Sequence, residues 1–184
     1  MKTLIFILFG TLFSHFAYTQ DEIRKSDEEN RSFTLAMKSR EKAEKVLRLF
    51  DTIHAPKLLY SIDDKHYLVI IKNDGSFSEY YVKMTSKNNI SDSLLLDNIE
   101  GKSGLLKRAF DLENYSSELI FDNRGIISAK KYFVVIDKNG KRYGECSVLS
   151  LPFVHIDDEL NMYCAKRLAE IVYGFELNWE KVNH

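Results

Sequence analysis

Apolar residues recur at three- and four-residue steps between residue 26 and about residue 53, with Lys, Arg and Glu between them. That spacing places the apolar side chains on one face of an amphipathic helix. The expected stripe consists of Phe33, Ala36, Met37, Ala43, Val46, Leu47 and Phe50. Ser26 and Glu29 form a capping box, which predicts that the helix begins there. The helix is expected to end before Pro56, because proline does not continue a helix.

Two stretches of alternating or continuous apolar residues fold back on themselves around glycine-containing turns and predict β-hairpins. Their strands are expected at residues 66–71 and 77–84, and at residues 132–136 and 143–149. The turns are Asp74-Gly75 and Asn139-Gly140, which favour two-residue hairpin loops. A further strand is expected before the first hairpin, because Leu58, Tyr60 and Ile62 alternate with other residues.

The two-residue loops fix which residues lie opposite one another. With this register, both faces of both hairpins carry mostly apolar side chains. Counting outward puts Tyr67 and Tyr80 on one face of the first hairpin, and Tyr132 and Tyr143 on the equivalent face of the second. Tyrosine combines an apolar ring with a polar tip, so these four residues are the candidate ligand-binding site. The alternative is that their rings belong to the core or to its rim. The same count places Asp137 opposite Arg142.

The C-terminal part of the chain predicts a helix over residues 158–173, capped by Asp157 and ending near Gly174. Ser103 is a candidate cap for a shorter helix. The leucines at 94–96 fit either a strand or a helix. The expected fold is therefore α+β: a long N-terminal helix, a mostly antiparallel sheet of about five strands built from two hairpins, and a C-terminal helix packed on the sheet.

Residues 1–19 have the pattern of a signal peptide. Lys2 precedes an apolar run from Leu4 to Phe13, and Ala17 and Thr19 occupy small-residue positions before a cleavage site. The run is shorter than the about 20 apolar residues that span a bilayer, although an uncleaved anchor is the alternative. The sequence thus predicts an exported protein, periplasmic or secreted, with residues 20–184 as a single domain and no transmembrane segment after cleavage.

Charge and repeats narrow the possible functions only slightly. Without the first 19 residues the chain has 25 basic and 27 acidic residues, a net charge of −2, which argues against nucleic acid as a partner. Residues 65–71 resemble residues 130–136. This likeness indicates either an internal duplication or the convergence of two hairpins on the same strand-forming residues.

The two cysteines, Cys146 and Cys164, are a candidate disulfide in an exported protein. Cys146 is expected on a sheet face, and Cys164 belongs to the apolar stripe of the C-terminal helix. If the helix packs on that face, the two residues meet. The alternative is that both are buried free thiols.

No catalytic, cofactor or metal motif is evident in the sequence. Gly101-Lys102-Ser103 resembles the end of a phosphate-binding loop, but Leu96 stands where the pattern needs a glycine. His155 and the acids that follow it suit a helix N-terminus better than a metal site. We therefore expect no cofactor and a non-enzymatic binding module for a protein, peptide or glycan. A hydrolase with a site assembled from distant acids or histidines, and a structural envelope component, are the alternatives.

Overall fold

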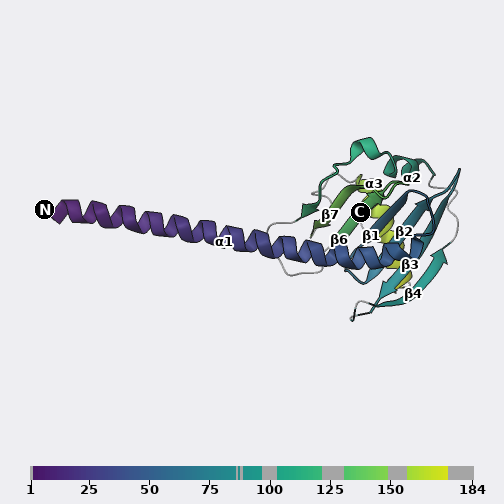
Figure 1. Cartoon of the computed structure of the whole chain (residues 1–184), viewed down its shortest axis with the longest axis horizontal. Helices are drawn as coiled ribbons and strands as arrows, with labels where there is room; N and C mark the ends of the chain where they lie inside the picture. The colour runs from purple at the N-terminus through teal and green to yellow at the C-terminus, as the bar shows by residue number, and fades with distance from the viewer. Residues whose placement is uncertain are drawn as a thin grey trace, which may run out of the picture.

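The computed structural model describes residues 2–85, 87, 89–96, 103–121, 131–148 and 157–173. Its helices are α1 (Lys2–Leu47), α2 (Ser103–Ala109) and α3 (Asp158–Tyr173), with short 3-10 turns η1 (Arg48–Phe50) and η2 (Leu112–Asn114). Its strands are β1 (Lys57–Ser61), β2 (His66–Lys72), β3 (Phe77–Met84), β4 (Ile90–Leu96), β5 (Ile120–Phe121), β6 (Lys131–Ile136) and β7 (Arg142–Val148). Figure 1 shows α1 running along the sheet and continuing well beyond it toward the N-terminus.

The strands form a seven-stranded sheet in the order β4-β3-β2-β1-β6-β7-β5. Neighbouring strands are antiparallel except β5 and β7, which are parallel. The predicted α+β class, the two hairpins and the two terminal helices are confirmed. The strand count is seven rather than about five, because residues 90–96 and 120–121 add strands at the two ends of the sheet.

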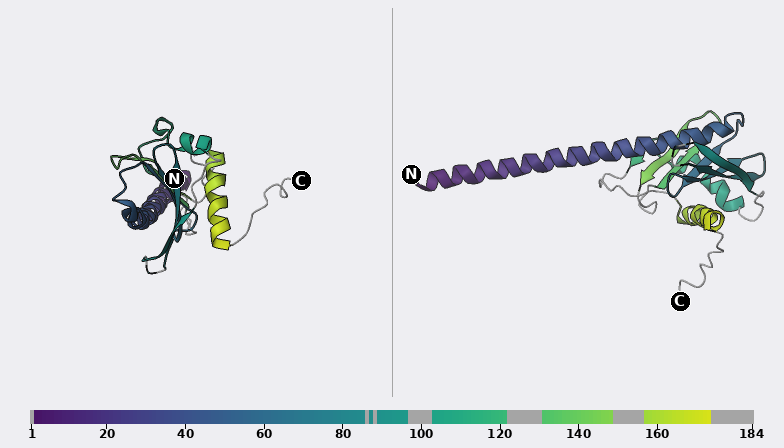
Figure 2. Two further views of the ribbon diagram at one scale, coloured as in Figure 1. Left: turned by 90° about the vertical axis from the view of Figure 1, so that its right-hand side faces the viewer. Right: turned by 90° about the horizontal axis from the view of Figure 1, so that it is seen from below.

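Helices cover the two faces of the sheet, as the left panel of Figure 2 shows, with α1 on one side and α2 and α3 on the other. The α1 side encloses one cluster of buried residues, including Val46, Phe50 and Val69. The α3 side encloses a second cluster, including Leu68 and Leu168. The apolar character that the sequence gives to both faces of each hairpin therefore reflects burial on both sides.

The long N-terminal helix begins at Lys2 and passes through Ser26, so the predicted start at a capping box is wrong. A cap fixes an end only where the preceding backbone leaves the helix, and here it does not. The residues that face the sheet are small at the outer end of the contact: Ser32, Ala36, Ser39 and Ala43 are almost fully buried. Phe33, expected in the stripe, is 48% exposed and packs edge-on against Phe121.

The first hairpin has the register that its two-residue loop predicts. Tyr67 lies opposite Val82 and Val69 opposite Tyr80, on the face toward α1. The backbone N–H of Asn73 donates to the carbonyl of Ser76 at 2.9 Å and closes the loop. Of the two central residues of this turn, Asp74 and Gly75, only Gly75 has a positive φ, at 83°. The turn is therefore not of the type that requires a positive φ at both positions.

The second hairpin has a loop that is one residue longer than predicted. The N–H of Gly140 donates to the carbonyl of Asp137 at 3.1 Å, and the N–H of Asp137 donates to the carbonyl of Lys141 at 2.9 Å. This is a three-residue loop closed by a glycine at φ 84°. Arg142 therefore lies opposite Ile136, and the predicted pairing of Asp137 with Arg142 is wrong.

The longer loop also moves Tyr143 to the other face of the sheet, because a one-residue shift in register inverts every side chain. Tyr143 lies opposite Val135 and packs against the core cluster on the α3 side. A bulge next to Gly144, at φ 58°, then restores the predicted pairing of Phe133 with Cys146.

The predicted C-terminal helix is confirmed at both ends, over Asp158–Tyr173. Asp157 caps it, because its Oδ1 accepts the N–H of Glu159 at 2.9 Å. The shorter helix is present over Ser103–Ala109, with the candidate cap Ser103 as its first residue. Within the described residues, no helix combines the length and the apolar character needed to cross a membrane.

Candidate functional site

The four candidate tyrosines do not lie on one accessible surface. The side chains of Tyr67 and Tyr132 are fully buried beneath α1, and Tyr80 is partly buried beside them, in edge-on contact with Phe50. Tyr143 is partly buried on the opposite face of the sheet. The structure therefore places two of the four in the core and separates the other two.

The two cysteines are free thiols, so the predicted disulfide between Cys146 and Cys164 is not formed in the structure. Both are fully buried in the cluster on the α3 side, which agrees with the predicted packing of the last helix on the sheet. Burial raises the pKa of Cys146 to about 12 and raises that of Cys164. Each thiol is thus held in its neutral, unreactive form.

The strand with the greatest exposure is β4, at one end of the sheet (Figure 1). Each residue from Ile90 to Leu95 is exposed. The side chains of Leu94 and Leu95 are 53% and 61% exposed. They project from opposite faces of the sheet, because successive side chains of a strand alternate. Among the described residues β3 is the only strand paired with β4, so the other long edge of β4 is open.

The register across β2, β3 and β4 places a row of polar residues next to a row of apolar ones on the α3 face. His66 lies opposite Lys83, which lies opposite Asp92. The neighbouring row is Leu68, Tyr81 and Leu94. The row from His66 to Asp92 is called the polar row below. It ends at the open edge, next to the exposed Leu94 side chain.

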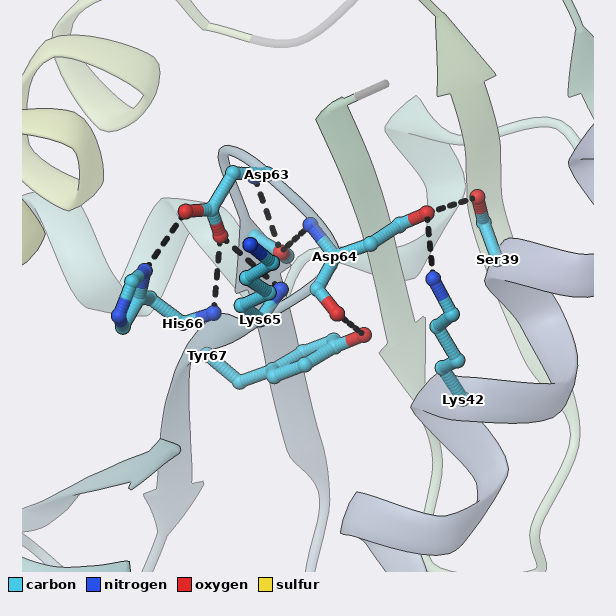
Figure 3. A network of polar contacts seen from close by, with 8 residues as sticks. Ser39, Lys42, Asp63, Asp64, Lys65, His66 and Tyr67 are labelled. Carbon is cyan, nitrogen blue, oxygen red and sulfur yellow. Dashed lines mark hydrogen bonds and ion pairs between the residues drawn. The ribbon is translucent and has the colours of Figure 1, made fainter. Parts of the chain in front are cut away.

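The polar row begins at a structured turn between β1 and β2, shown in Figure 3. Asp63 accepts the N–H groups of Lys65 and His66 through Oδ1, at 3.0 and 2.9 Å. Its Oδ2 lies 2.6 Å from Nδ1 of His66. The imidazole also stacks on the ring of Tyr81, with centroids 6.2 Å apart. Asp63 therefore fixes the orientation of the His66 ring and leaves Nε2 as its other polar atom.

Asp64 ties the same turn to α1 from the other side. Its Oδ2 accepts the Ser39 hydroxyl at 2.9 Å and lies 3.3 Å from Nζ of Lys42. The Tyr67 hydroxyl donates to the Asp64 carbonyl at 3.0 Å (Figure 3). Asp64 has a φ of 59°, a conformation that Asp tolerates better than most residues. These contacts anchor the turn, and with it the start of the polar row, to the long helix.

The electrostatics of the polar row reach the tyrosine beside it. Burial raises the pKa of Tyr81, and the negative charges of Asp63 and Asp92 raise it further. The hydroxyl of Tyr81 therefore stays protonated in the physiological range and can donate a hydrogen bond. Together with the oriented imidazole, the row offers donors and acceptors beside an apolar edge, which is an arrangement suited to recognition.

Two buried carboxylates lie elsewhere and connect helices to the sheet. Glu79 is fully buried, accepts the Tyr163 hydroxyl and lies 3.0 Å from Nε of Arg167 on α3. Glu145 is 4% exposed and lies 3.2 Å from Nε of Arg40 on α1 and 2.9 Å from Nη1 of Arg142. Because each carboxylate is enclosed by donors, we assign both to structural ion pairs.

The polar row and the open edge were not predicted from the sequence. The run of leucines at 94–96 fits a strand or a helix, and the row depends on a register that passes through a bulge near Met84. No alternation of apolar and polar residues identifies β4, because Ser91, Asp92 and Ser93 are all polar and the three leucines that follow are continuous.

Comparisons of this chain with protein families, curated proteins and solved structures found no match. Within the described residues, no group of three or more His, Cys, Asp or Glu side chains is arranged to hold a metal ion.

Proposed function

We propose that the protein is an exported, non-enzymatic binding module that takes an extended segment of a partner protein as an additional strand along β4. The observation that carries this proposal is the open edge of β4 with its exposed leucines. Edge strands in soluble proteins are normally protected by charge, proline or a covering element. From Asp92 to Leu96, β4 has a single charged residue and no proline.

The chemistry of an open strand edge selects its partner. The unpaired N–H and C=O groups of the edge are satisfied by another extended backbone, and alternate side chains of the added strand supply specificity. Leu94 and Leu95 offer apolar contacts on the two faces. An added strand would cover both side chains, which are otherwise left in water.

Charge favours a different protein over a second copy of this chain as the source of the strand. When two copies of β4 pair in antiparallel fashion with matching faces, Asp92 meets Ile90, Asp92, Leu94 or Leu96 of the other copy. None of these residues is basic. A partner with a basic residue opposite Asp92 and apolar residues opposite the leucines fits better. The part of the added strand that lies beside Asp92 also adjoins the polar row, from His66 through Lys83 to Asp92. Polar side chains are therefore expected at that end of the partner segment.

The proposed export rests on the first 19 residues. Cleavage after Thr19 would leave the part of α1 that contacts the sheet, from Ser32 onward, in the mature protein. The mass of the exported chain should correspond to an N-terminus at or near Gln20. Recovery of a chain that still begins at Met1 would contradict cleavage.

The binding proposal can be tested with a displayed library of random 12-residue peptides as the probe. Peptides selected on the purified protein should contain apolar residues and a basic residue, and they should slow hydrogen exchange at backbone amides of residues 92–96. The double variant Leu94→Lys/Leu95→Lys should lose this binding, because charged residues on an edge disfavour strand addition. Its stability should change by less than about 1 kcal/mol, since both side chains are exposed.

The matched control is Met162→Lys. It adds one charge on α3, at an apolar side chain that is 56% exposed. This variant should bind the selected peptides as the parent does. Peptides that bind the double variant equally well would place recognition elsewhere. A dimer in light scattering that dissociates in the double variant would show that β4 pairs with itself, contrary to the proposal.

A further inference from the structure

A cavity of about 330 Å³ lies between the end of α1 and the β6–β7 turn, away from β4. Its walls come from the last turns of α1, the segment before β1, the end of β6 and the loop at residues 137–140. The volume is at the lower end of the range of about 300–1,000 Å³ for ligand pockets. It suits one small molecule rather than a peptide chain.

Three apolar side chains form part of the cavity wall and are continuous with the core. Leu47 is buried in the cluster beneath α1, and Ile53 and Ile136 pack partly buried against the same cluster. A ligand that occupies the cavity would therefore place an apolar group against these three side chains, where burial of apolar surface stabilises the complex.

The cavity contains a lysine with one ammonium donor to spare. Nζ of Lys57 donates to the carbonyls of Ile53 and Ala55, at 2.5 and 3.2 Å. An ammonium has three N–H donors, so one remains for a ligand. Lys138 adds a second cation from the β6–β7 turn. These groups suit an anionic ligand group, such as a carboxylate.

Acidic side chains line the same cavity. Asp137 uses Oδ1 to accept the N–H groups of Asn139 and Lys141, at 2.8 and 2.9 Å, which leaves Oδ2 for a ligand. Asp51, in the segment that follows α1, is an exposed carboxylate that also lines the cavity. A ligand with a single sign of charge would meet repulsion from one of the two sets, whereas a zwitterion can satisfy both.

We propose that this cavity binds a free α-amino acid with an apolar side chain. The side chain of the amino acid lies against Leu47, Ile53 and Ile136. The α-carboxylate accepts from Lys57 and Lys138, and the α-ammonium donates to Asp137 and Asp51. This site is separate from the edge of β4, and the proposal does not depend on the binding function proposed for that edge.

The test is calorimetric titration of the purified protein with L-leucine and three analogues. Leucinamide lacks the carboxylate, N-acetyl-leucine lacks the ammonium, and glycine lacks the side chain. Each analogue should bind roughly tenfold or more weakly than leucine, as expected for the loss of one charged hydrogen bond or of the apolar contact. Equal binding of leucine and leucinamide, or no binding of leucine at about 10 mM, would overturn the proposal.

Two variants locate the site. Lys138→Gln and Asp51→Asn change exposed side chains that line the cavity, and each should weaken leucine binding severalfold. Lys107→Gln, an exposed lysine on α2, is the control and should bind leucine as the parent does. Unchanged affinity in both cavity variants would show that leucine binds elsewhere, which contradicts the proposal.

Discussion

Replacement of Gly144 by alanine should destabilise the fold more than the same change at any other described glycine. Gly144 lies at the bulge of β7 with a φ of 58°, where an L-residue is strained. An added Cβ would lie 2.6 Å from Cδ1 and 3.1 Å from Cγ of Tyr115, and 3.3 Å from Cε1 of Phe133. Rotation of the ring about Cβ–Cγ leaves Cγ in place, so relief of this contact requires a change of the Tyr115 χ1 angle or of the backbone.

The expected magnitude has two contributions. A positive φ costs a non-glycine residue roughly 1–2 kcal/mol. Overpacking of a formed core costs typically about 1–3 kcal/mol more. The backbone also resists adjustment, because the N–H of Gly144 donates to the carbonyl of Ser116 at 2.7 Å. Gly144→Ala should therefore lower the free energy of unfolding by about 2–5 kcal/mol.

Alanine substitutions at two other glycines separate the contribution of backbone strain from that of overpacking. Gly140 has a φ of 84° but open space around its Cβ position, so Gly140→Ala should cost only the roughly 1–2 kcal/mol of backbone strain. Gly104 lies in α2 with open space and no positive φ, so Gly104→Ala should stabilise by roughly 0.5–1 kcal/mol.

Urea unfolding followed by circular dichroism measures all three variants on one scale. The expected order of stability is Gly104→Ala above the parent, then Gly140→Ala, then Gly144→Ala. If Gly144→Ala costs no more than Gly140→Ala, the close approach of Tyr115 does not constrain the bulge, and the explanation given for Gly144 is wrong.

Burial raises the pKa of Glu79, although the hydrogen bonds from Tyr163 and Arg167 oppose this. The folded state then binds the proton more tightly than the unfolded state, so the contribution of Glu79 to stability is present below about pH 4.3 and is lost as pH rises through the folded pKa. Urea unfolding at pH 4 and pH 8 should therefore show Glu79→Gln gaining on the parent as pH rises, and a constant difference would contradict this. Unreduced protein denatured in guanidinium should react with a thiol reagent at both Cys146 and Cys164, and the native protein should react slowly at both; a denatured protein without free thiols would instead show the disulfide.

The sequence predicts most of the fold where local chemistry decides it. The apolar period and Asp157 predict α3 over its full length, and Asp74-Gly75 fixes the register of the first hairpin. The same reasoning fails at Asn139-Gly140, where Asp137 accepts two N–H groups of the turn and stabilises a loop one residue longer. This extra loop residue places Tyr143 on the other face of the sheet, so one of the four tyrosines of the predicted site is separated from the rest.

The rest of the site depends on pairings between distant segments, which no local pattern encodes. The burial of Tyr67 and Tyr132 follows from the small side chains of α1, which allow the helix to lie close to the sheet. The polar row follows from the alignment of β2, β3 and β4. The exposure of Leu94 and Leu95 follows from the place of β4 at the end of the sheet, and sequence alone does not give strand order.

The central position of β1 divides the assembly of the sheet into a local part and a distant part. Leu59 pairs with Val69, about 10 positions away, and on its other side with Val134, about 75 positions away. Loop-closure entropy grows with the logarithm of loop length, so the second pairing costs about 2 kcal/mol more chain entropy than the first. The strands from β1 to β4 form a meander of neighbours in sequence, whereas β6 and β7 join only when a long loop closes. The two halves of this sheet thus differ in contact order, the property that governs folding rate, although they share one strand.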